Sequence, residues 1–335
     1  MNAIPKSPSI HDVARLAEVS IATVSLATHH PDRIAPATVA RVRAAVHELN
    51  YKPLRTHKNR ALSVVTLGQL GVLFPDRKHP SSPQIEQFNI MIARGANERL
   101  VTKGTQLLVS QISPSDEVPI MLSENHVGGV IARSSSYAPE VMSLLKGLPM
   151  VWVSGPSPGA LGMDLVQANN FCHGTQAANF LISTGIRRVK VIKPECNLTE
   201  EHHQRALGCV LELAKAGVSA DELTSSSLLE EPHFSLGEST GIYVTGNDED
   251  LVTIYQRLEN FLPCPAGFPP MVGTLTNEDI AALLTDRVHV LGMNPIELGK
   301  RAADCLMWRI DNPYEAAVTI QVPPLKISKI PLART

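Results

Sequence analysis

The sequence predicts a small all-α helix-turn-helix domain followed by a larger α/β domain with parallel sheets. Three observations predict this division. Residues 1–62 carry nine Lys and Arg against four Asp and Glu, whereas the rest of the chain has 21 basic and 28 acidic residues. Up to Leu49, apolar residues recur every three to four positions, as on one face of a helix. Beyond residue 70, short apolar runs alternate with helical patterns, as in parallel sheets covered by helices on both faces.

Composition places the chain among ordinary globular proteins. It has 335 residues, of which 44% are hydrophobic and 19% charged, which is enough for two or three domains. No apolar run is long enough for a transmembrane helix, and the N-terminus has no apolar core of a signal peptide. The five cysteines are widely spaced, which argues against a zinc ribbon or a disulfide framework. We therefore expect a cytoplasmic protein without metal or cofactor.

Three helices are predicted in the basic segment. Ser9, with Asp12 three positions on, is typical of a helix start, and this helix stops near Glu18. Ser20 begins a second helix after a short turn of helix-turn-helix length. Pro36 opens the third. The buried stripe of the third helix is expected to comprise Val39, Val42, Val46 and Leu49. Such a domain with a positive surface suits docking of the second helix in a DNA major groove.

Two patterns with fixed spacing run through residues 10–53. They are Ile10-x-Asp12-Val13-Ala14-x-x-Ala17-x-Val19-Ser20-x-x-Thr23-Val24-Ser25 and Val46-x-Glu48-Leu49-Asn50-Tyr51-x-Pro53. Together they closely resemble the headpiece of the lac repressor (LacI/GalR) family of bacterial transcriptional regulators. The resemblance implies a helix-turn-helix DNA-binding headpiece over residues 1–53.

The same resemblance implies which residues contact DNA. The two positions that read base edges in the family are Ile21 and Ala22, whose apolar side chains can meet thymine methyl groups but cannot hydrogen-bond a guanine or adenine. Leu26 stands where the family usually has Arg or His, so an arginine–guanine contact worth about 1–3 kcal/mol is missing. We expect an atypical operator or weaker base specificity; the alternative is that Ile21 and Leu26 pack in the core. The other expected DNA contacts are Ser20, Thr23, Ser25, Asn50 and Tyr51.

Residues 54–66 are expected to form a hinge. In the family, a short linker folds into a helix on DNA and places a leucine in the minor groove. The usual leucine position, seven residues past Pro53, holds Arg60, but the linker is longer than usual, so Leu62 is the expected displaced lever. The alternative is a basic linker in which Arg55, Lys58 and Arg60 contact phosphates.

The remainder of the chain alternates expected strands and helices. The strands are expected over residues 70–74, 106–110, 127–132, 150–153, 189–192, 241–245, 271–273 and 288–291. Helical patterns include residues 84–101, 173–184, 204–216 and 295–310. Ligands of open α/β sheets bind beyond the carboxyl ends of the strands, so we expect a pocket there.

The family resemblance continues through this region. The matching segments are Gly128-Gly129-Val130-Ile131, Val166-x-x-Asn169-Asn170, Gly185-Ile186-Arg187-Arg188-Val189, Arg205-x-x-Gly208, Gly246-Asn247-Asp248 and Asn294-Pro295-x-x-x-Gly299-x-x-Ala302. They imply a two-lobed periplasmic-binding-protein-like core over residues 67–335 that dimerises and senses an effector.

The resemblance also implies an effector site. Its expected residues are Phe88, Asn169, Arg205, Asn247 and Asp248. Arg205 suits a grip on hydroxyls, a carboxylate or a phosphate, with an interlobe salt bridge as the alternative. The alternative role of Asn247 or Asp248 is to cap the helix that follows. Two carboxylates of the family pattern are missing, at Asn169 and between residues 272 and 276. The effector is therefore a sugar or a different, anionic molecule, unless effector control is lost.

Other classes of protein fit the sequence less well. The chain contains no G-x-G-x-x-G, G-x-x-x-x-G-K-[ST], H-E-x-x-H or G-x-S-x-G pattern, so no catalytic residue is assigned and an enzyme is not expected. A periplasmic solute-binding protein would not need a basic headpiece. We expect a homodimeric repressor that binds a pseudo-palindromic operator and a small-molecule effector. The alternative is an effector-independent repressor or architectural protein with a vestigial pocket.

Overall fold

The chain forms two compact units, residues 1–60 and residues 61–335. The computed structural model describes residues 10–29, 34–49, 69–75, 83–112, 118–124, 126–133, 139–145, 148–154, 163–195, 199–227, 239–261, 269–275, 284 and 288–329. Within these residues, no helix combines the length and apolar character that crossing a membrane requires.

The described part of the first unit consists of helices α1 (Ile10–Leu16), α2 (Ile21–His29) and α3 (Pro36–Glu48). Their boundaries confirm the predicted helix-turn-helix pattern. One small core holds the three helices together, and it comprises Val13, Ala14, Ala17, Val24, Ala27, Val39, Val42 and Ala45, with Val46 and Leu49 partly buried against it. The predicted stripe of α3 therefore faces this core. Ser9, the expected cap of α1, lies outside the described residues.

The second unit contains two six-stranded sheets. The first has the order β11-β5-β4-β3-β1-β2 and the second β12-β10-β9-β8-β6-β7. Strands of the first sheet are β1 (Gln69–Pro75), β2 (Gln106–Ile112), β3 (Val130–Ala132), β4 (Met150–Val153), β5 (Asp164–Ala168) and β11 (Thr319–Val322). Strands of the second are β6 (Arg188–Lys193), β7 (Ser219–Thr224), β8 (Thr240–Val244), β9 (Met271–Leu275), β10 (Val288–Gly292) and β12 (Ser328–Lys329). All of these pairings are parallel except that of β10 with β12.

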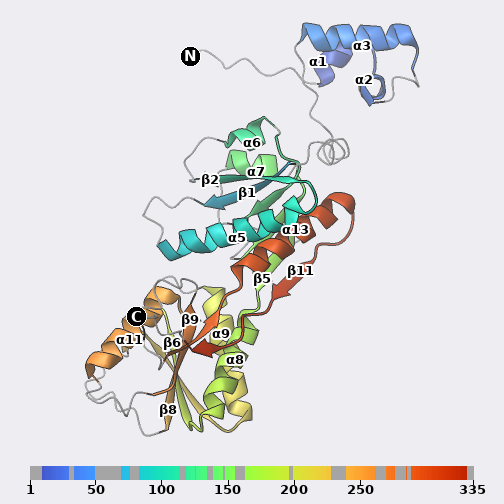
Figure 1. The fold of residues 1–335 in the computed structure, drawn as a ribbon. Helices are drawn as coiled ribbons and strands as arrows, with labels where there is room; N and C mark the ends of the chain where they lie inside the picture. Colours follow the sequence, from blue (N-terminus) through green and yellow to red (C-terminus); the bar gives the residue numbers. More distant parts are fainter. Residues whose placement is uncertain are drawn as a thin grey trace. The chain divides into compact units, whose positions relative to one another are not determined.

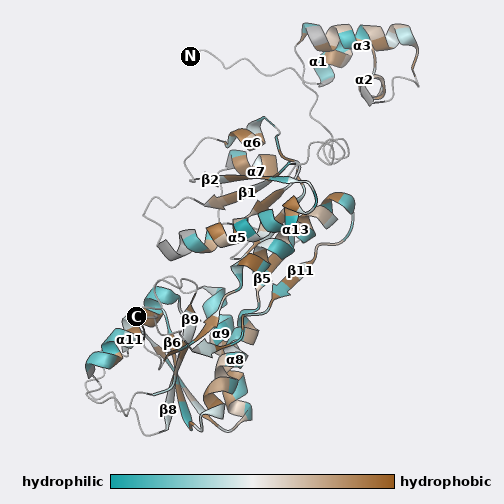
Figure 2. Cartoon of the chain, viewed as in Figure 1, coloured by the Kyte–Doolittle hydropathy of each residue, from teal (hydrophilic) through white to brown (hydrophobic). Residues whose placement is uncertain are grey.

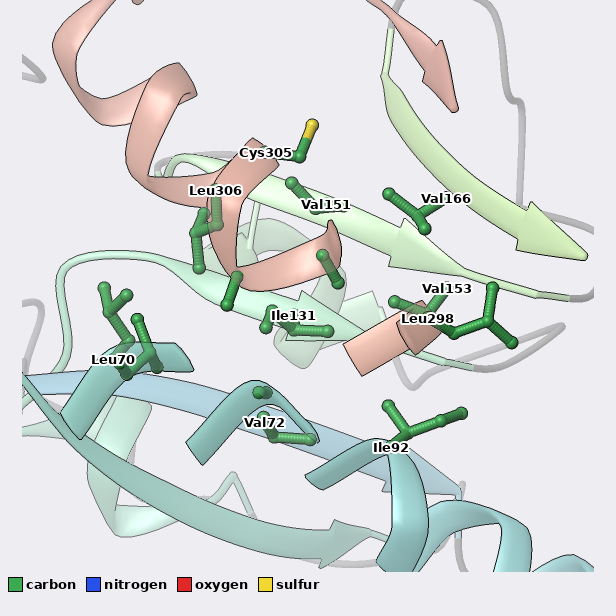
Figure 3. Packing of buried hydrophobic residues seen from close by; sticks show 14 of the residues in the cluster. Leu70, Val72, Ile92, Ile131, Val151, Val153, Val166, Leu298, Cys305 and Leu306 are labelled. Carbon is green, nitrogen blue, oxygen red and sulfur yellow. The ribbon is translucent and has the colours of Figure 1, made fainter. Parts of the chain in front are cut away.

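Helices cover both faces of the first sheet. Helices α5 (Pro83–Val101) and α13 (Pro295–Asp311) pack together on one face. Helices α6 (Ile120–Ser123) and α7 (Pro139–Leu145) belong to the core cluster of the other face. Figure 3 shows how Ile92 of α5 and Leu298 and Leu306 of α13 meet apolar strand residues such as Val72 and Ile131. This sheet with its helices is called the first lobe.

The second sheet has the same layered arrangement. Helices α8 (Asn170–Ser183) and α9 (Glu200–Lys215) lie on one face, and α11 (Asp248–Phe261) lies on the other (Figure 1). Two separate apolar clusters fill the two interfaces. The inner strands β8 and β9 are mostly buried, whereas the edge strand β7 is mostly hydrophilic. The helices carry both hydrophobic and hydrophilic residues (Figure 2). This sheet with its helices is called the second lobe, and the two lobes confirm the predicted α/β core with parallel sheets.

Three segments connect the lobes. The chain leaves the first lobe after β5, returns between β10 and α13, and leaves again after β11. Strand β3 begins at Val130, so it is shorter than the run predicted at 127–132. Gly128 and Gly129 precede it, although the Gly129 carbonyl oxygen accepts a hydrogen bond from Gly71 N of β1. Strands β5, β7, β11 and β12 were not predicted from the sequence.

Candidate nucleic-acid interface and ligand-binding residues

The turn between α1 and α2 positions Ser20 at the start of α2. Glu18 has a φ of 51°, the left-handed conformation that lets the chain reverse within three residues. Thr23 N donates to Ser20 Oγ at 3.1 Å, so Ser20 caps the helix as predicted. The two hydroxyls of Ser20 and Thr23 also hydrogen-bond each other at 2.8 Å. Because one hydroxyl donates to the other, one hydroxyl hydrogen is left to donate to a phosphate oxygen.

Helix α2 has a buried face and an exposed face. Val24 is 1% exposed and packs in the small core with Ala27. On the other side, Ile21 is 41% exposed, Leu26 is 37% exposed, and Ala22 is exposed as well. The alternative in which Ile21 and Leu26 pack in the core is therefore wrong. Both side chains are available to a partner, which base reading requires.

The basic residues of this unit differ in their surroundings. Arg15 forms an ion pair with Asp12 on α1, so its charge is compensated. Arg41 and Arg43 lie exposed on α3. The remaining expected DNA contacts, Asn50, Tyr51, Arg55, Lys58, Arg60 and Leu62, lie outside the described residues, as does the side chain of Ser25.

In the second lobe, Arg205 of α9 lies in a buried polar network. It is 5% exposed, and its Nε donates to Asn170 Oδ1 at 2.8 Å. One terminal nitrogen donates to the Thr245 carbonyl oxygen at 2.9 Å and lies 3.3 Å from Thr274 Oγ1, while the other is 3.6 Å from the Met293 sulfur. These partners are all neutral. The interlobe salt bridge considered for Arg205 is thus not among the contacts of its guanidinium in the described residues.

A buried histidine extends this network, and sequence reasoning missed it. His173 Nδ1 lies 2.8 Å from the Tyr243 hydroxyl, and Nε2 lies 3.3 Å from Thr274 Oγ1. Burial, together with the positive charge of Arg205, lowers the pKa of His173 to about 3. The imidazole is therefore neutral near neutral pH. A histidine within an otherwise apolar helical pattern was the available signal.

The expected asparagines serve as helix caps. Asn169 Oδ1 accepts from Cys172 N at 2.9 Å and caps α8. Asn247 Oδ1 accepts from the amides of Glu249 and Asp250 at the start of α11, while Asp250 Oδ2 accepts from Asn247 N. Burial raises the pKa of Asp250. The alternative that Asn247 caps the following helix is thus confirmed.

The other expected ligand residues are largely covered. Asp248 is 1% exposed within the first turn of α11. Phe88 belongs to the first lobe, where it is 8% exposed and packs in the core next to α13. The guanidinium of Arg133 lies 5.0 Å from the centre of its ring, and it donates to Asn89 Oδ1. In the parts of the chain that the structure covers, no three His, Cys, Asp or Glu side chains are placed to hold a metal ion.

The first unit is similar to the DNA-binding domains of known bacterial regulators. The family model described as bacterial regulatory proteins, lacI family, matches residues 9–53, which include the three helices that the structure describes in the first unit. The first unit therefore contains a LacI-family helix-turn-helix domain. The members of this family are transcription regulators with a helix-turn-helix DNA-binding domain, and they are not enzymes.

Individual LacI-family proteins support this placement. The transcriptional regulator RegA of Clostridium acetobutylicum is 32% identical over 180 residues, which span 53% of this chain and 52% of that protein. The ribose operon repressor of Escherichia coli is 24% identical over 96% of this chain and 98% of that protein. The fold is similar to that of the lac repressor dimer bound to operator and an anti-inducer, with a TM-score of 0.56 and 18% identity over 98% of this chain and all of that chain.

Proposed function

We propose that this protein is a transcriptional repressor that binds a specific, pseudo-palindromic operator as a homodimer. One observation carries the proposal: α2 of a LacI-family headpiece exposes the face that would enter a major groove, in a unit with an excess of positive charge. Its similarity to ribose operon repressors over most of the chain supports repression. Such a regulator acts in the cytoplasm, where the bacterial chromosome lies.

The proposed division of labour follows the chain. Residues 1–53 bind DNA, residues 54–66 act as the hinge, and residues 67–335 dimerise and sense an effector. Ile21, Ala22 and Leu26 face the bases, while Ser20, Thr23 and Ser25 contact phosphates. Asn50, Tyr51, Arg55, Lys58, Arg60 and Leu62 complete the DNA-binding set. A symmetric dimer requires a symmetric site, and the similarity to a lac repressor dimer on operator supports this arrangement.

The proposed effector contacts Arg205. The guanidinium is buried, yet its described acceptors are neutral, and one terminal nitrogen faces a thioether, which is a weak acceptor. A ligand oxygen would provide a stronger acceptor there. Arginine binds carboxylate and phosphate through two parallel hydrogen bonds, so an acidic metabolite fits this site as well as a sugar. Phe88, Asn169, Asn247 and Asp248 remain the other proposed contacts.

A second candidate function is repression without an effector. The side-chain oxygens of Asn169 and Asn247 are already committed to capping amides, and Asp248 is almost fully buried. These residues then stabilise the second lobe instead of contacting a ligand. In this alternative, the core serves dimerisation alone.

Fluorescence anisotropy of the full-length protein tests both candidates. We expect tight binding to DNA from its own upstream region, with the logarithm of affinity falling by about 0.9 per phosphate contact for each tenfold rise in salt. Thr23→Ala should weaken binding to all sequences alike. Absence of specific binding by the folded protein at low salt would refute the function. A panel of sugars and acidic metabolites then separates the candidates, since only an effector-controlled repressor changes its affinity.

A matched pair of variants assigns the effector contact. Arg205→Lys keeps the charge but loses the fork of donors, so it should abolish the response to the effector. Asn247→Asp keeps the capping oxygen and should preserve folding, because the cap accepts hydrogen bonds from two amides. An effector response that survives Arg205→Lys unchanged would remove Arg205 from the site.

A further inference from the structure

We propose that α2 recognises its DNA sites through the C5-methyl groups of thymine, without side-chain hydrogen bonds from its exposed apolar residues to base edges. The inference rests on the proposed DNA-binding function and names the chemical feature that is read. It makes Ile21, Ala22 and Leu26 the residues that determine specificity.

Helix α2 has its exposed apolar residues on one side. At about 100° per residue, positions 21, 22 and 26 lie within an arc of about 140° on one side of the helix. The buried residues Val24 and Ala27 lie on the opposite side. Among the side chains that the structure describes, this arc carries an isoleucine, an alanine and a leucine, none of which has a side-chain donor or acceptor. Ser25 and His29 also occupy helix positions within the arc. The side chains of Ile21, Ala22 and Leu26 therefore cannot read the hydrogen-bonding pattern of a base pair.

The exposed apolar face of α2 lies in a unit with an excess of positive charge. Exposed apolar side chains on a small domain indicate a binding site when they gather on one face. The surrounding unit has a net charge of +5 over residues 1–62, and Arg41 and Arg43 are exposed on α3. The complementary partner is therefore polyanionic and yet presents apolar groups. The major groove of DNA fits both requirements, because each thymine displays a methyl group there between the phosphate backbones.

The polar side chains near the start of α2 bond to each other and to the backbone. Ser20 and Thr23 hydrogen-bond each other at 2.8 Å, and the Thr23 amide donates to Ser20 Oγ. One hydroxyl hydrogen remains for both residues, which suits a phosphate oxygen. Bidentate base reading needs two groups of fixed geometry on one side chain, as in arginine, asparagine or glutamine. The described exposed face of α2 supplies no such side chain.

A specific tolerance follows from this mode of reading. 5-Methylcytosine carries a methyl group at the same ring position as thymine, whereas uracil and cytosine lack it. A protein that reads the methyl group should accept 5-methylcytosine in place of thymine and reject uracil. A protein that reads the thymine O4 acceptor should do the opposite, because uracil keeps this oxygen and 5-methylcytosine has an amino group instead.

The experiment uses the full-length protein and synthetic duplexes. Preferred sites are first selected from random duplex DNA, and each T·A pair of a half-site is then replaced by U·A, 5-methylcytosine·G or C·G. At one or more thymines we expect 5-methylcytosine to bind nearly as well as thymine, and uracil to bind about fourfold more weakly, the effect of losing one buried methyl-sized group. The same change in both half-sites should cost about fifteenfold.

Matched variants identify the side chain that meets each methyl group. Ile21→Ala or Leu26→Ala should remove the penalty for uracil at one position. Leu16→Ala is the control, because Leu16 is a 42% exposed leucine in the same unit but lies on α1. We expect this control to keep the full uracil penalty. All three residues are substantially exposed, so the truncated proteins should fold.

The possible results distinguish a failure of thymine-methyl reading from a failure of the proposed DNA-binding function. If specific sites are selected but uracil binds as well as thymine while 5-methylcytosine does not, methyl reading is overturned and the DNA-binding function stands. Sensitivity to uracil that persists in both α2 variants would also overturn the assignment to α2. If the folded protein selects no sequence from the random pool, both the inference and the proposed function are overturned.

Discussion

The contact between α8 and α9 leaves no room for a side chain at Gly174. A Cβ there would lie 1.9 Å from the Arg205 carbonyl oxygen and 2.7 Å from Cys209 N, both backbone atoms of α9. Because Cβ atoms do not approach other atoms within 3.0 Å, Gly174→Ala should force the helices apart by at least about 1.1 Å. The cost of such overpacking is typically about 1–3 kcal/mol in the free energy of unfolding.

The same displacement should disturb the buried network. Arg205 moves with α9 and Asn170 with α8, so their 2.8 Å hydrogen bond would lengthen to about 3.9 Å, beyond hydrogen-bonding distance. Losing this bond from a buried guanidinium should add about 1–3 kcal/mol to the destabilisation. We therefore expect Gly174→Ala to unfold at a clearly lower urea concentration, measured by circular dichroism.

Gly71→Ala is the control for this prediction. Its Cβ would meet only side-chain atoms, of which the nearest are the flexible Met121 Cε and Sδ at 3.3 Å. The strand should accommodate alanine with a change below about 1 kcal/mol, since the thioether can change rotamer. If Gly174→Ala and Gly71→Ala unfold at the same urea concentration, the close approach of α8 and α9 is refuted.

Three further perturbations have defined outcomes. Burial lowers the pKa of His173 from 6.5 to about 3, so this imidazole binds a proton more readily in the unfolded chain. Its contribution to the free energy of unfolding is therefore complete above pH 6.5 and should fall by about 2 kcal/mol on going to pH 5. Urea titrations above pH 6.5 and at pH 5 should show a smaller fall in His173→Gln than in the unmodified protein, and an equal fall would contradict the low pKa of His173. Asp164→Asn breaks a buried two-point ion pair with Arg309 (2.6 and 2.8 Å) and should lower the free energy of unfolding by about 3–5 kcal/mol, measured by thermal unfolding. Glu297→Gln breaks an exposed pair with Arg301 and should lower it by less than about 1 kcal/mol. Equal effects of the two variants would contradict this ranking. Ser20→Ala removes the α2 cap and should lower the free energy of unfolding of the first unit by about 1 kcal/mol in the same assay. An unchanged unfolding midpoint would contradict this prediction.

Much of the fold follows from local patterns in the sequence. The strand at 150–153 is four consecutive apolar residues, all buried in the structure, and the α2 cap is a serine at the expected position. Strand β7 escaped prediction because it is an edge strand with little apolar character. Its Glu222 pairs with Lys193 of β6 at 2.9 Å, so an ion pair across the strands takes the place of an apolar alternation.

The exposed face of α2 was more predictable from the sequence than the surroundings of the proposed ligand contacts. In α2, the 3.6-residue period separates Val24 from Ile21 and Leu26, and the structure agrees with that separation. In the second lobe, the family resemblance implied that Asn169 and Asn247 contact a ligand, yet their side-chain oxygens cap helices. An asparagine after a strand fits both roles locally, and only its nearest amides decide between them.

The sequence by itself determined the helix-turn-helix, its LacI-family pattern and the alternation of strands and helices, because each of these depends on residues that are close along the chain. Only the tertiary structure decided what surrounds Arg205. Its partners Asn170, Thr245, Thr274 and Met293 come from segments far apart in the sequence. They meet because β8 and β9 are neighbours in the sheet and α8 packs on α9. The partners of a buried charge depend on such long-range neighbours, and no local periodicity encodes them.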